Sequence, residues 1–275
     1  MVIFTAASDN VTIDNVKTSK MVPSGNGKVS ATCPACSPFA AGGGIAGTIE
    51  TSSYTFGRAP RLNIYNTSNL VDLSADTPDN LTRDSYLGGT IGSGSSGYYT
   101  LNITSALNRG YINAESISGR ILYAGGLIGS ISAPVNIDKS CNYANILGNV
   151  NLNFSDNGSQ KKEVWASGLA GYVVGHSEGT SVSQSCNTGD VTAVIAGSGS
   201  VLDLRESYSG GLFGIVYYED SGVAYFSDNY NTGDVYSETN HINGDSYAGG
   251  IVSYTQGISD NTSAMTIKNN FNLGK

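Results

Sequence analysis

The sequence predicts an all-β protein, a parallel β-helix (β-solenoid) of about six coils with roughly 40 residues per coil and essentially no long helix. The first observation is composition: the 36 Gly and the abundant Ser, Thr and Asn are poor helix formers, whereas 17 Tyr and many Val, Ile and Thr favour strands. The second observation is that two short motifs alternate along most of the chain at intervals of roughly 40 residues, as expected for stacked repeats.

The first motif is an aromatic residue, any residue, two small residues, an apolar pair and a small residue. It occurs at 86–92, 123–129, 165–171, 208–214 and 247–253, with a copy that lacks the aromatic residue at 43–47. Small residues at fixed places suit sharp corners and close contacts between coils, where Gly is the usual choice. We therefore expect one corner of each coil at this motif.

The second motif is an apolar residue, Asn, any residue, a small residue, any residue and an apolar residue. Copies lie at 65–70, 107–112, 141–146, 186–191 and 230–235, with a truncated copy at 271–275 and a degenerate one at 16–21. Asn followed by a small residue suits a left-handed turn between strands. We expect the apolar positions to stack into two interior ladders, one of Val16, Tyr65, Leu107, Cys141, Cys186, Tyr230 and Phe271 and one of Met21, Leu70, Ile112, Ile146, Val191 and Val235.

A polar residue stands two positions before each member of the first ladder. These residues are Asp14, Asn63, Ser105, Lys139, Gln184, Asp228 and Asn269. The pattern leaves open whether they face outward or mark a bulge.

The chain divides into an irregular N-terminal stretch or first partial coil (1–40) and one continuous solenoid domain (41–275). The stretch contains Cys33-Pro34-Ala35-Cys36, a lone C-x-x-C. Zinc would need a second pair of ligands, so a local disulfide between Cys33 and Cys36 is expected in an exported protein, with a reduced pair as the alternative. Cys141 and Cys186 occupy equivalent repeat positions, which predicts stacked core thiols or a bridge between adjacent coils.

The pairing of a Gly-Gly-Leu-x-Gly box with a downstream Cys/Tyr-Asn-Thr-Gly-Asp-Val box resembles the GLUG repeat of bacterial cell-surface proteins. These include adhesin-like proteins and non-catalytic parts of IgA-specific metallopeptidases. The resemblance covers about residues 40 to 275, is strongest at 124–129, 186–191, 208–214 and 230–235, and departs at Thr90, Ser167 and Ser253. It implies an exported, surface-attached, non-catalytic module located outside the cell, and it supplies no ligand and no catalytic residue.

The acidic net charge limits the classes of partner that the protein is expected to bind. The net charge is -8, with 22 Asp and Glu against 14 Lys and Arg. Nucleic acids and anionic membranes need clustered basic residues, so neither is expected as a partner. No targeting segment is visible and no run of 18 apolar residues occurs, so direct membrane insertion is not expected; the chain fits the exported part of a longer precursor.

Two motifs suggest catalysis or nucleotide binding, but their contexts do not fit. Residues 175–179 match G-x-S-x-G and are followed by Asp220 or Asp228 and by His241, yet a nucleophile elbow needs a strand that turns into a helix. Residues 92–97 match G-x-G-x-x-G but precede a strand-like run instead of a helix. We therefore predict no catalytic residue, no cofactor and no metal.

The aromatic residues that open the first motif form a column. Its members are Tyr86, Tyr123, Trp165, Tyr208 and Tyr247. We interpret the column as a stacked structural ladder, with an exposed sugar- or peptide-binding platform as the alternative. Residues outside the repeat frame are better candidates for ligand binding, because loops carry function. The candidates are Tyr98, Tyr99, Tyr217, Tyr218, Glu219 and Asp220.

Three functions remain open. The first is a non-catalytic structural or adhesive module that binds host or neighbouring-cell protein or glycan. The second is a glycan-cleaving β-helix enzyme or tailspike, which needs two carboxylates in a groove beside aromatic rings. The third is a subunit of an extracellular filament, in which the open solenoid ends meet other copies or segments of the same surface protein.

Overall fold

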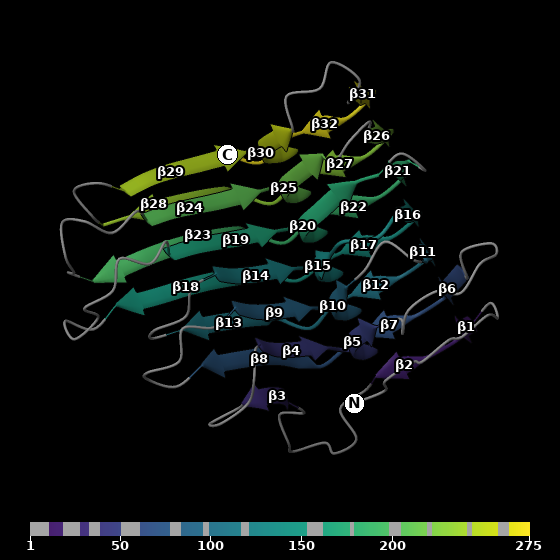
Figure 1. Ribbon diagram of the computed structural model, residues 1–275, viewed down its shortest axis with the longest axis horizontal. Helices are drawn as coiled ribbons and strands as arrows, with labels where there is room; N and C mark the ends of the chain where they lie inside the picture. The colour runs from purple at the N-terminus through teal and green to yellow at the C-terminus, as the bar shows by residue number, and fades with distance from the viewer. Residues whose placement is uncertain are drawn as a thin grey trace.

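The computed structural model describes residues 11–18, 28–32, 39–50, 61–77, 84–95, 99–116, 121–152, 162–176, 179–197, 205–218, 222–240, 244–257 and 264–275. These residues form a parallel β-helix of six coils with five strands each, followed by the first two strands of a seventh coil (Figure 1). No helix occurs in this part of the chain. The predicted fold class is confirmed.

Each coil passes in turn through five parallel sheets, here called A to E. Sheet A contains β1 (Val11–Asp14), β6 (Arg61–Tyr65), β11 (Thr100–Thr104), β16 (Val135–Asp138), β21 (Thr180–Ser183), β26 (Val223–Ser227) and β31 (Ala264–Lys268). Sheet B contains β2 (Lys17–Thr18), β7 (Ser68–Asn69), β12 (Leu107–Asn108), β17 (Cys141–Asn142), β22 (Cys186–Asn187), β27 (Tyr230–Asn231) and β32 (Phe271–Asn272).

The other three sheets have six strands each. Sheet C contains β3 (Lys28–Thr32), β8 (Asp72–Thr77), β13 (Ile112–Ser116), β18 (Ile146–Leu152), β23 (Val191–Gly197) and β28 (Val235–Thr239). Sheet D contains β4 (Phe39–Gly43), β9 (Asp84–Gly88), β14 (Ile121–Gly125), β19 (Lys162–Ser167), β24 (Arg205–Gly210) and β29 (Gly244–Gly249). Sheet E contains β5 (Ala46–Glu50), β10 (Ile91–Ser95), β15 (Ile128–Ile131), β20 (Ala170–Gly175), β25 (Phe213–Tyr218) and β30 (Val252–Gly257).

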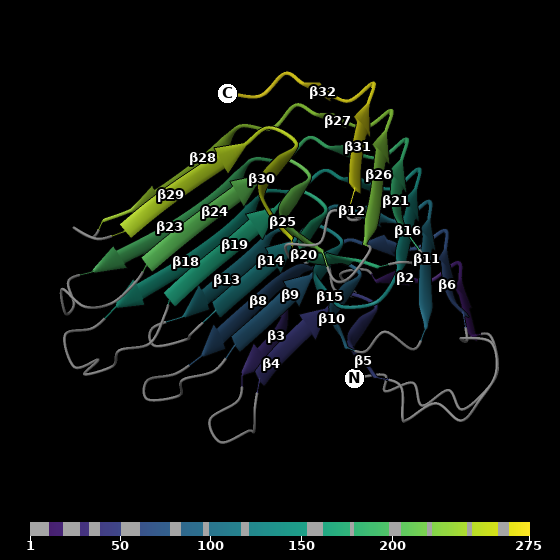
Figure 2. The ribbon, with the colours of Figure 1, turned by 45° about the horizontal axis from the view of Figure 1, so that its top comes forward.

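Two apolar cores fill the interior. The strands of sheets C and D run along one flank, and those of sheet A line the opposite flank (Figure 2). One core is built mainly from sheets A and E, with Ile64, Ile103 and Phe226 fully buried in it. The other is built from sheets C and D, with Leu73 and Val164 fully buried. Alternating in-and-out side chains on sheet A give the burial pattern expected for half-buried strands.

The second predicted interior ladder is confirmed from the third coil onward. Its members Ile112, Ile146, Val191 and Val235 are register partners on sheet C. In the second coil the partner is Leu73 instead of Leu70, and in the first it is Val29, whereas Met21 lies outside the described residues. The expected register slipped by three residues because Asn66 and Asn69 both resemble the motif Asn.

The first predicted ladder is wrong as an interior column, although its members from Leu107 to Phe271 are register partners. In the sheet B strands from β7 to β27 the second residue, an Asn, is buried. The residue before it is half-buried or exposed except at Cys186, which is buried; Tyr230 is 40% exposed, and Phe271 in β32 is 61% exposed. The register partners of Leu107 in earlier coils are Ser68 and Lys17, not Tyr65 and Val16. A two-residue strand turns only one side chain inward, and here the turn that follows it needs an interior hydrogen-bond donor.

A column of hydrogen-bonded Asn residues runs along the solenoid, buried in every coil but the last. The column consists of Asn69, Asn108, Asn142, Asn187, Asn231 and Asn272. Asn187 shows the pattern: its Nδ2 donates to the Gly189 carbonyl (2.7 Å) and to Asn231 Oδ1 (2.7 Å), while its Oδ1 accepts from Asn142 Nδ2 (2.7 Å). Each amide therefore closes its own turn and joins the next coil, and the expected left-handed turn at this Asn is not found.

The left-handed residue lies three positions earlier, at the corner between sheets A and B. Positive φ angles near 50° recur at Asn15, Asn66, Ser105, Lys139, Gln184, Asp228 and Asn269. Five of these are the polar positions noted in the sequence, whereas the first two coils use Asn15 and Asn66 instead of Asp14 and Asn63. The polar position is thus a corner residue, whose side chain need not enter the core.

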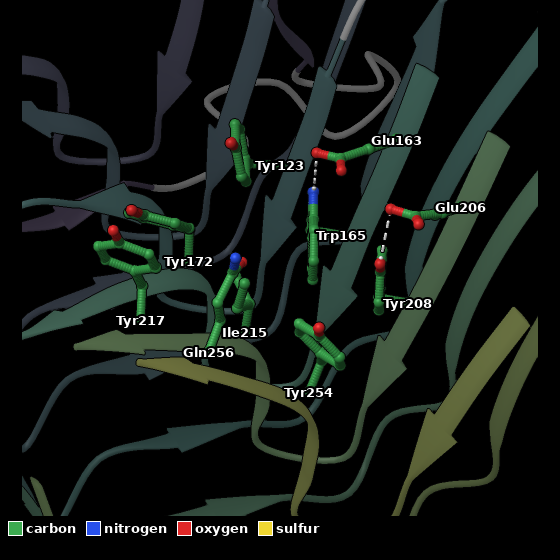
Figure 3. A pocket seen from close by; sticks show the side chains of 10 residues that line it. All are labelled: Tyr123, Glu163, Trp165, Tyr172, Glu206, Tyr208, Ile215, Tyr217, Tyr254 and Gln256. Carbon is green, nitrogen blue, oxygen red and sulfur yellow. Dashed lines mark hydrogen bonds between the residues drawn. The ribbon is translucent and has the colours of Figure 1, made fainter. Parts of the chain in front are cut away.

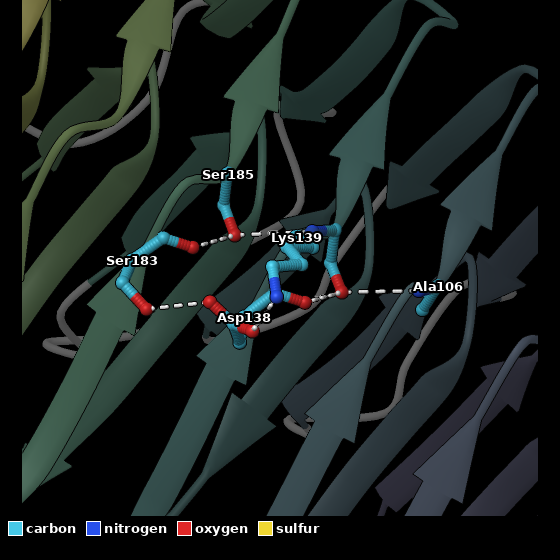
Figure 4. A network of polar contacts seen from close by, with 6 residues as sticks. Ala106, Asp138, Lys139, Ser183 and Ser185 are labelled. Atoms are coloured by element: carbon cyan, nitrogen blue, oxygen red, sulfur yellow. Dashed lines mark hydrogen bonds and ion pairs between the residues drawn. The ribbon is translucent and has the colours of Figure 1, made fainter.

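Hydroxyl groups brace this corner (Figure 4). Ser140 Oγ donates to the Asp138 carbonyl (2.8 Å), and Ser183 Oγ donates to Asp138 Oδ1 (2.7 Å) from the next coil. Ser185 Oγ donates to the Ser183 carbonyl (2.8 Å) and accepts from the Ser140 N–H (3.1 Å). Lys139 Nζ lies 3.6 Å from Asp138 at the surface. These bonds offset the cost of the left-handed conformation, which is about 1–2 kcal/mol for a residue with a side chain.

The two sequence motifs meet across the interior. The second Gly of each first motif lies at the corner between sheets D and E, directly against the Asn column. At Gly168 a Cβ atom would stand 2.3 Å from Asn187 Cγ and 2.1 Å from the carbonyl oxygen of Gly211 in the next coil. The glycine is therefore required by the close approach of two walls.

A disulfide joins Cys141 and Cys186 across two coils, with Cα atoms 4.5 Å apart. The bridge that the sequence left as an alternative to stacked thiols is the observed state. Cys33 and Cys36 lie outside the described residues.

The last coil leaves apolar side chains exposed. Ile267 occupies the interior position that Phe226 fills one coil earlier, yet it is 49% exposed, and Leu273 is 78% exposed. Contact of the ends with other copies stays a prediction. No candidate for a membrane-crossing helix occurs in the described part of the chain.

Candidate binding groove

The predicted aromatic column is present on the outer face of sheet D. Tyr86, Tyr123, Trp165, Tyr208 and Tyr247 are register partners in five successive coils. The ring centroids of Tyr86 and Tyr123 are 5.1 Å apart, those of Trp165 and Tyr208 are 3.6 Å apart, and those of Tyr208 and Tyr247 are 4.9 Å apart, and within each pair the ring planes are nearly parallel. The interpretation as a stacked ladder is confirmed.

A second outward column, on sheet E, faces the ladder. It reads Thr48, Ser93, Ser130, Tyr172, Ile215 and Tyr254. Rings of the two sheets meet at steep angles: Tyr123 and Tyr172 are 5.5 Å apart at 68°, and Trp165 and Tyr254 are 6.3 Å apart at 50°. Because outward side chains of both sheets touch, the surface between sheets D and E is concave. We call it the D–E groove.

The groove holds a hollow of about 340 Å³ in its C-terminal half (Figure 3). The residues that line it are Tyr123, Glu163, Trp165, Tyr172, Glu206, Tyr208, Ile215, Tyr217, Tyr254 and Gln256. Trp165, Tyr208 and Ile215 are each only 3% exposed and make an apolar floor, packed separately from the two interior cores. The volume falls in the usual range for small-molecule sites, about 300–1,000 Å³.

Carboxylates accompany the ladder rings. The residue two positions before a ladder residue, on the same outer face, is Asp84, Glu163, Glu206 or Asp245 in four of the coils. Glu163 Oε2 accepts a hydrogen bond from Trp165 Nε1 (3.2 Å), and Glu206 Oε2 accepts one from the Tyr208 hydroxyl (2.8 Å). These carboxylates orient the rings and make one wall of the groove acidic.

Burial and the neighbouring acids keep the ladder phenols protonated. Burial raises the pKa of Tyr208 far above its ordinary value of 10, and the hydrogen bond to Glu206 raises it further. Burial, with the Asp84 carboxylate next in effect, likewise raises the pKa of Tyr86, and burial raises that of Tyr123. The groove therefore presents neutral hydroxyl groups at any physiological pH.

These shifts predict a loss of stability at alkaline pH. In the unfolded chain the phenols ionise near pH 10, whereas the half-buried phenols Tyr86 and Tyr123 and the buried phenol Tyr208 stay protonated in the folded protein. The unfolded state thus binds fewer protons above pH 10, and the free energy of unfolding falls as pH rises. Thermal melts from pH 8 to 12 should show a constant midpoint up to about pH 9.5 and a steep decline above it.

Absorbance of phenolate provides the control. The folded protein should show an early group of tyrosines and a late group that ionises only on unfolding, and Tyr208→Phe should reduce the late group by one. Complete ionisation of all tyrosines near pH 10 in a protein that is still folded would contradict the assignment.

The structure places the sequence-predicted binding residues in different surroundings. Tyr217 lines the hollow. Tyr99, 2% exposed, belongs to the interior core, and so does Tyr218, 6% exposed, whose burial raises its pKa to about 12. Tyr98, Glu219 and Asp220 lie outside the described residues. Tyr217 is thus the described candidate that reaches the groove.

Sequence reasoning missed Glu206, Tyr172, Tyr254 and Gln256 as lining residues. A signal for Glu206 was present, because an acid two positions before the ladder residue recurs in four coils. No comparable signal marks the sheet E column, where small residues in the early coils are replaced by large apolar and aromatic ones only from Tyr172 onward.

Most of the hydrolase-like motif lies outside the described residues, so its assembly stays untested. Asp228 sits at the left-handed corner between sheets A and B, with φ of 58°, while Ser177, Asp220 and His241 lie outside the described residues. Within the described ranges, no group of three or more His, Cys, Asp or Glu side chains is arranged to hold a metal ion.

No family model, no curated protein and no solved structure matches the chain.

Proposed function

We propose that the protein is a non-catalytic, exported β-solenoid module of adhesive type that binds host or neighbouring-cell ligands, protein or glycan, in the D–E groove. The observation that carries the proposal is the hollow of about 340 Å³ between the aromatic ladder of sheet D and the stretch of the sheet E column that contains Tyr172, Ile215 and Tyr254. Rigid aromatic rings give large contact area at low entropic cost, and such surfaces are typical of recognition sites.

Two further features support export. The disulfide between Cys141 and Cys186 suits an oxidising compartment, since such bonds are rare in the cytosol. The resemblance of the two repeat motifs to GLUG repeats of bacterial surface proteins points the same way. A solenoid is also suited to presenting a binding groove at a cell surface, because each coil contacts only its neighbours and the stack extends the groove along one axis.

The runner-up function is a glycan-cleaving enzyme, favoured by the neighbouring carboxylates Glu163 and Glu206 on the groove wall. Catalytic pairs need an acid and a base or nucleophile that act on substrate. Here each carboxylate accepts a hydrogen bond from the ring two residues later, and the same acid and ring arrangement recurs at Tyr86 and Tyr247. A structural role explains the repeated pair, which is why we propose a binding module.

Adhesion of the intact chain tests the proposal. Beads coated with the protein are offered to a panel of host-cell surfaces and immobilised extracellular proteins. The double variant Tyr217→Ala/Tyr254→Ala is expected to lose at least about 10-fold in binding, because aromatic anchors dominate interface energies.

The matched control is Tyr225→Ala/Tyr236→Ala, which removes two tyrosines that are 52% and 51% exposed on other faces. It should bind like the unmodified chain. Equal adhesion by both double variants would show that the groove is not the binding site. Release of new reducing ends from a bound glycan would overturn the non-catalytic assignment.

A further inference from the structure

The D–E groove is not uniform along the solenoid. In the first three coils the sheet E column carries Thr48, Ser93 and Ser130, and in the next three it carries Tyr172, Ile215 and Tyr254. Apolar and aromatic side chains therefore line both walls only in the C-terminal half, where the hollow lies. A ligand held there occupies about three coils and is short, or it is the end of a longer chain.

The floor and the rim of the hollow differ in chemistry. Trp165 and Ile215 form the floor, and the Trp165 ring lies between Tyr208 on one side and the open centre of the hollow on the other (Figure 3). The rim carries neutral polar groups, among them the hydroxyls of Tyr172 and Tyr217 and the amide of Gln256 (Figure 3). An apolar floor below several neutral hydrogen-bonding groups matches a ligand with apolar C–H faces and many hydroxyls.

The charged residues that line the hollow favour neutral over anionic ligands of this hydroxyl-rich class. The ionised groups among the described lining residues are the carboxylates Glu163 and Glu206. Lys162 and Arg205 stand next to them in sequence, but each is 1% exposed and alternates to the interior side of the strand. An anionic ligand would meet like charge with no basic side chain among the described lining residues, and like-charge contacts oppose binding.

A cationic peptide is the competing class, because it would be attracted to the two carboxylates. It would leave most of the rim unmatched, however, since the phenols and the amide are neutral, and one oxygen of each carboxylate already accepts a bond from a ladder ring. Hydroxyl-rich ligands satisfy more of these groups, and unpaired polar groups at a binding site cost affinity.

We infer that the hollow binds a neutral glycan, as a short segment or a chain end that spans about three coils. This inference rests on the proposed function, in which the groove is the binding site. Sugar C–H faces pack on the half-buried rings of Tyr172, Tyr217 and Tyr254, and sugar hydroxyls bond to Gln256 and to the glutamates.

The chain contains a single tryptophan, and Trp165 lies at the floor of the hollow, so its fluorescence reports on this site alone. The intact protein is titrated with neutral oligosaccharides built from glucose, galactose, mannose or N-acetylglucosamine, with sialylated and uronic acid oligosaccharides, and with an oligo-lysine peptide. At least one neutral oligosaccharide should change the Trp165 emission saturably, and the acidic ones should not.

Two variants test the site, and circular dichroism and thermal melting check their folding. Tyr217→Ala and Gln256→Ala are each expected to weaken the neutral glycan about 10-fold, the size of one lost hydrogen bond or ring contact. Gln256 is exposed, so its replacement tests the site even if Tyr217→Ala proves unstable. Tyr225→Ala, on the outer face of sheet A, is the matched control and should bind normally.

The failures are distinguishable. If oligo-lysine alone changes the emission and Tyr217→Ala abolishes that change, the glycan inference is overturned while the groove keeps its proposed role. The same inference fails if acidic oligosaccharides bind as well as neutral ones, or if glycan binding is indifferent to both variants. If no probe changes the Trp165 emission, the glycan inference fails, whereas the proposed function fails only if Tyr217→Ala/Tyr254→Ala adheres as well as the unmodified chain.

Discussion

Replacement of Asn187 with alanine is expected to lower the free energy of unfolding by about 3–5 kcal/mol, because it breaks the buried Asn column at its centre. The substitution removes the donor to the Gly189 carbonyl, the donor to Asn231 Oδ1 and the acceptor for Asn142 Nδ2. All three partners stay buried, and each buried group left without a partner costs about 1–3 kcal/mol. Chemical denaturation followed by circular dichroism measures the change.

Two variants separate hydrogen bonding from packing. Asn187→Asp keeps the shape but removes both N–H donors, so it should be nearly as unstable as the alanine variant. Asn145→Ala is the exposed control: its Oδ1 accepts one bond from the Asp190 N–H (2.9 Å), and its loss should cost about 1 kcal/mol or less. If Asn187→Ala were no more damaging than Asn145→Ala, the column would not stabilise the solenoid.

Replacement of Gly168 with alanine is expected to cost at least about 3 kcal/mol and to prevent folding in a marginally stable background. The added Cβ would lie 2.1 Å from the Gly211 carbonyl oxygen and 2.3 Å from Asn187 Cγ. Neither obstacle is the flexible end of a side chain, so two coils must separate to admit the methyl group. The thermal midpoint and the yield of folded protein measure the effect.

Gly257 supplies the matched control. A Cβ at this exposed position on sheet E would meet nothing closer than Tyr218 Cβ at 3.8 Å. Gly257→Ala should therefore be neutral or slightly stabilising, since alanine restricts the unfolded chain. A loss of stability at Gly257→Ala as large as that at Gly168→Ala would mean that glycine acts through strand propensity instead of through close contact between walls.

Repetition made the fold predictable, whereas the direction of individual side chains was harder to predict. The aromatic column from Tyr86 to Tyr247 is confirmed because its rings recur at one motif position, and register places them one above another in successive coils. The ladder through Leu107 and Tyr230 is wrong because apolar character was assumed to mean burial. In a two-residue strand that precedes a tight turn, the buried amide of Asn satisfies carbonyl groups that an apolar side chain would leave unpaired.

The groove was only partly predictable for a related reason. Loop residues were predicted as the best candidates, and of those that the structure describes, Tyr217 lines the hollow, whereas Tyr99 and Tyr218 are buried. Glu163 and Glu206 belong to different coils, and the sheet D register places them side by side. A binding surface formed by two sheets depends on the angle between them, which no local pattern encodes.

The sequence by itself determined that this chain is a parallel solenoid, how many coils it has and which residues recur at equivalent places, because stacking requires the same side-chain type at the same point of every coil. Only the tertiary structure decided that the two motifs pack against each other. The Gly corner between sheets D and E packs directly on the Asn column of sheet B, so the two walls of the coil are in close contact there. The sequence shows the two motifs as separate segments. They come into contact only when the chain folds around a complete coil, because sheet B and the D–E corner face each other across the interior.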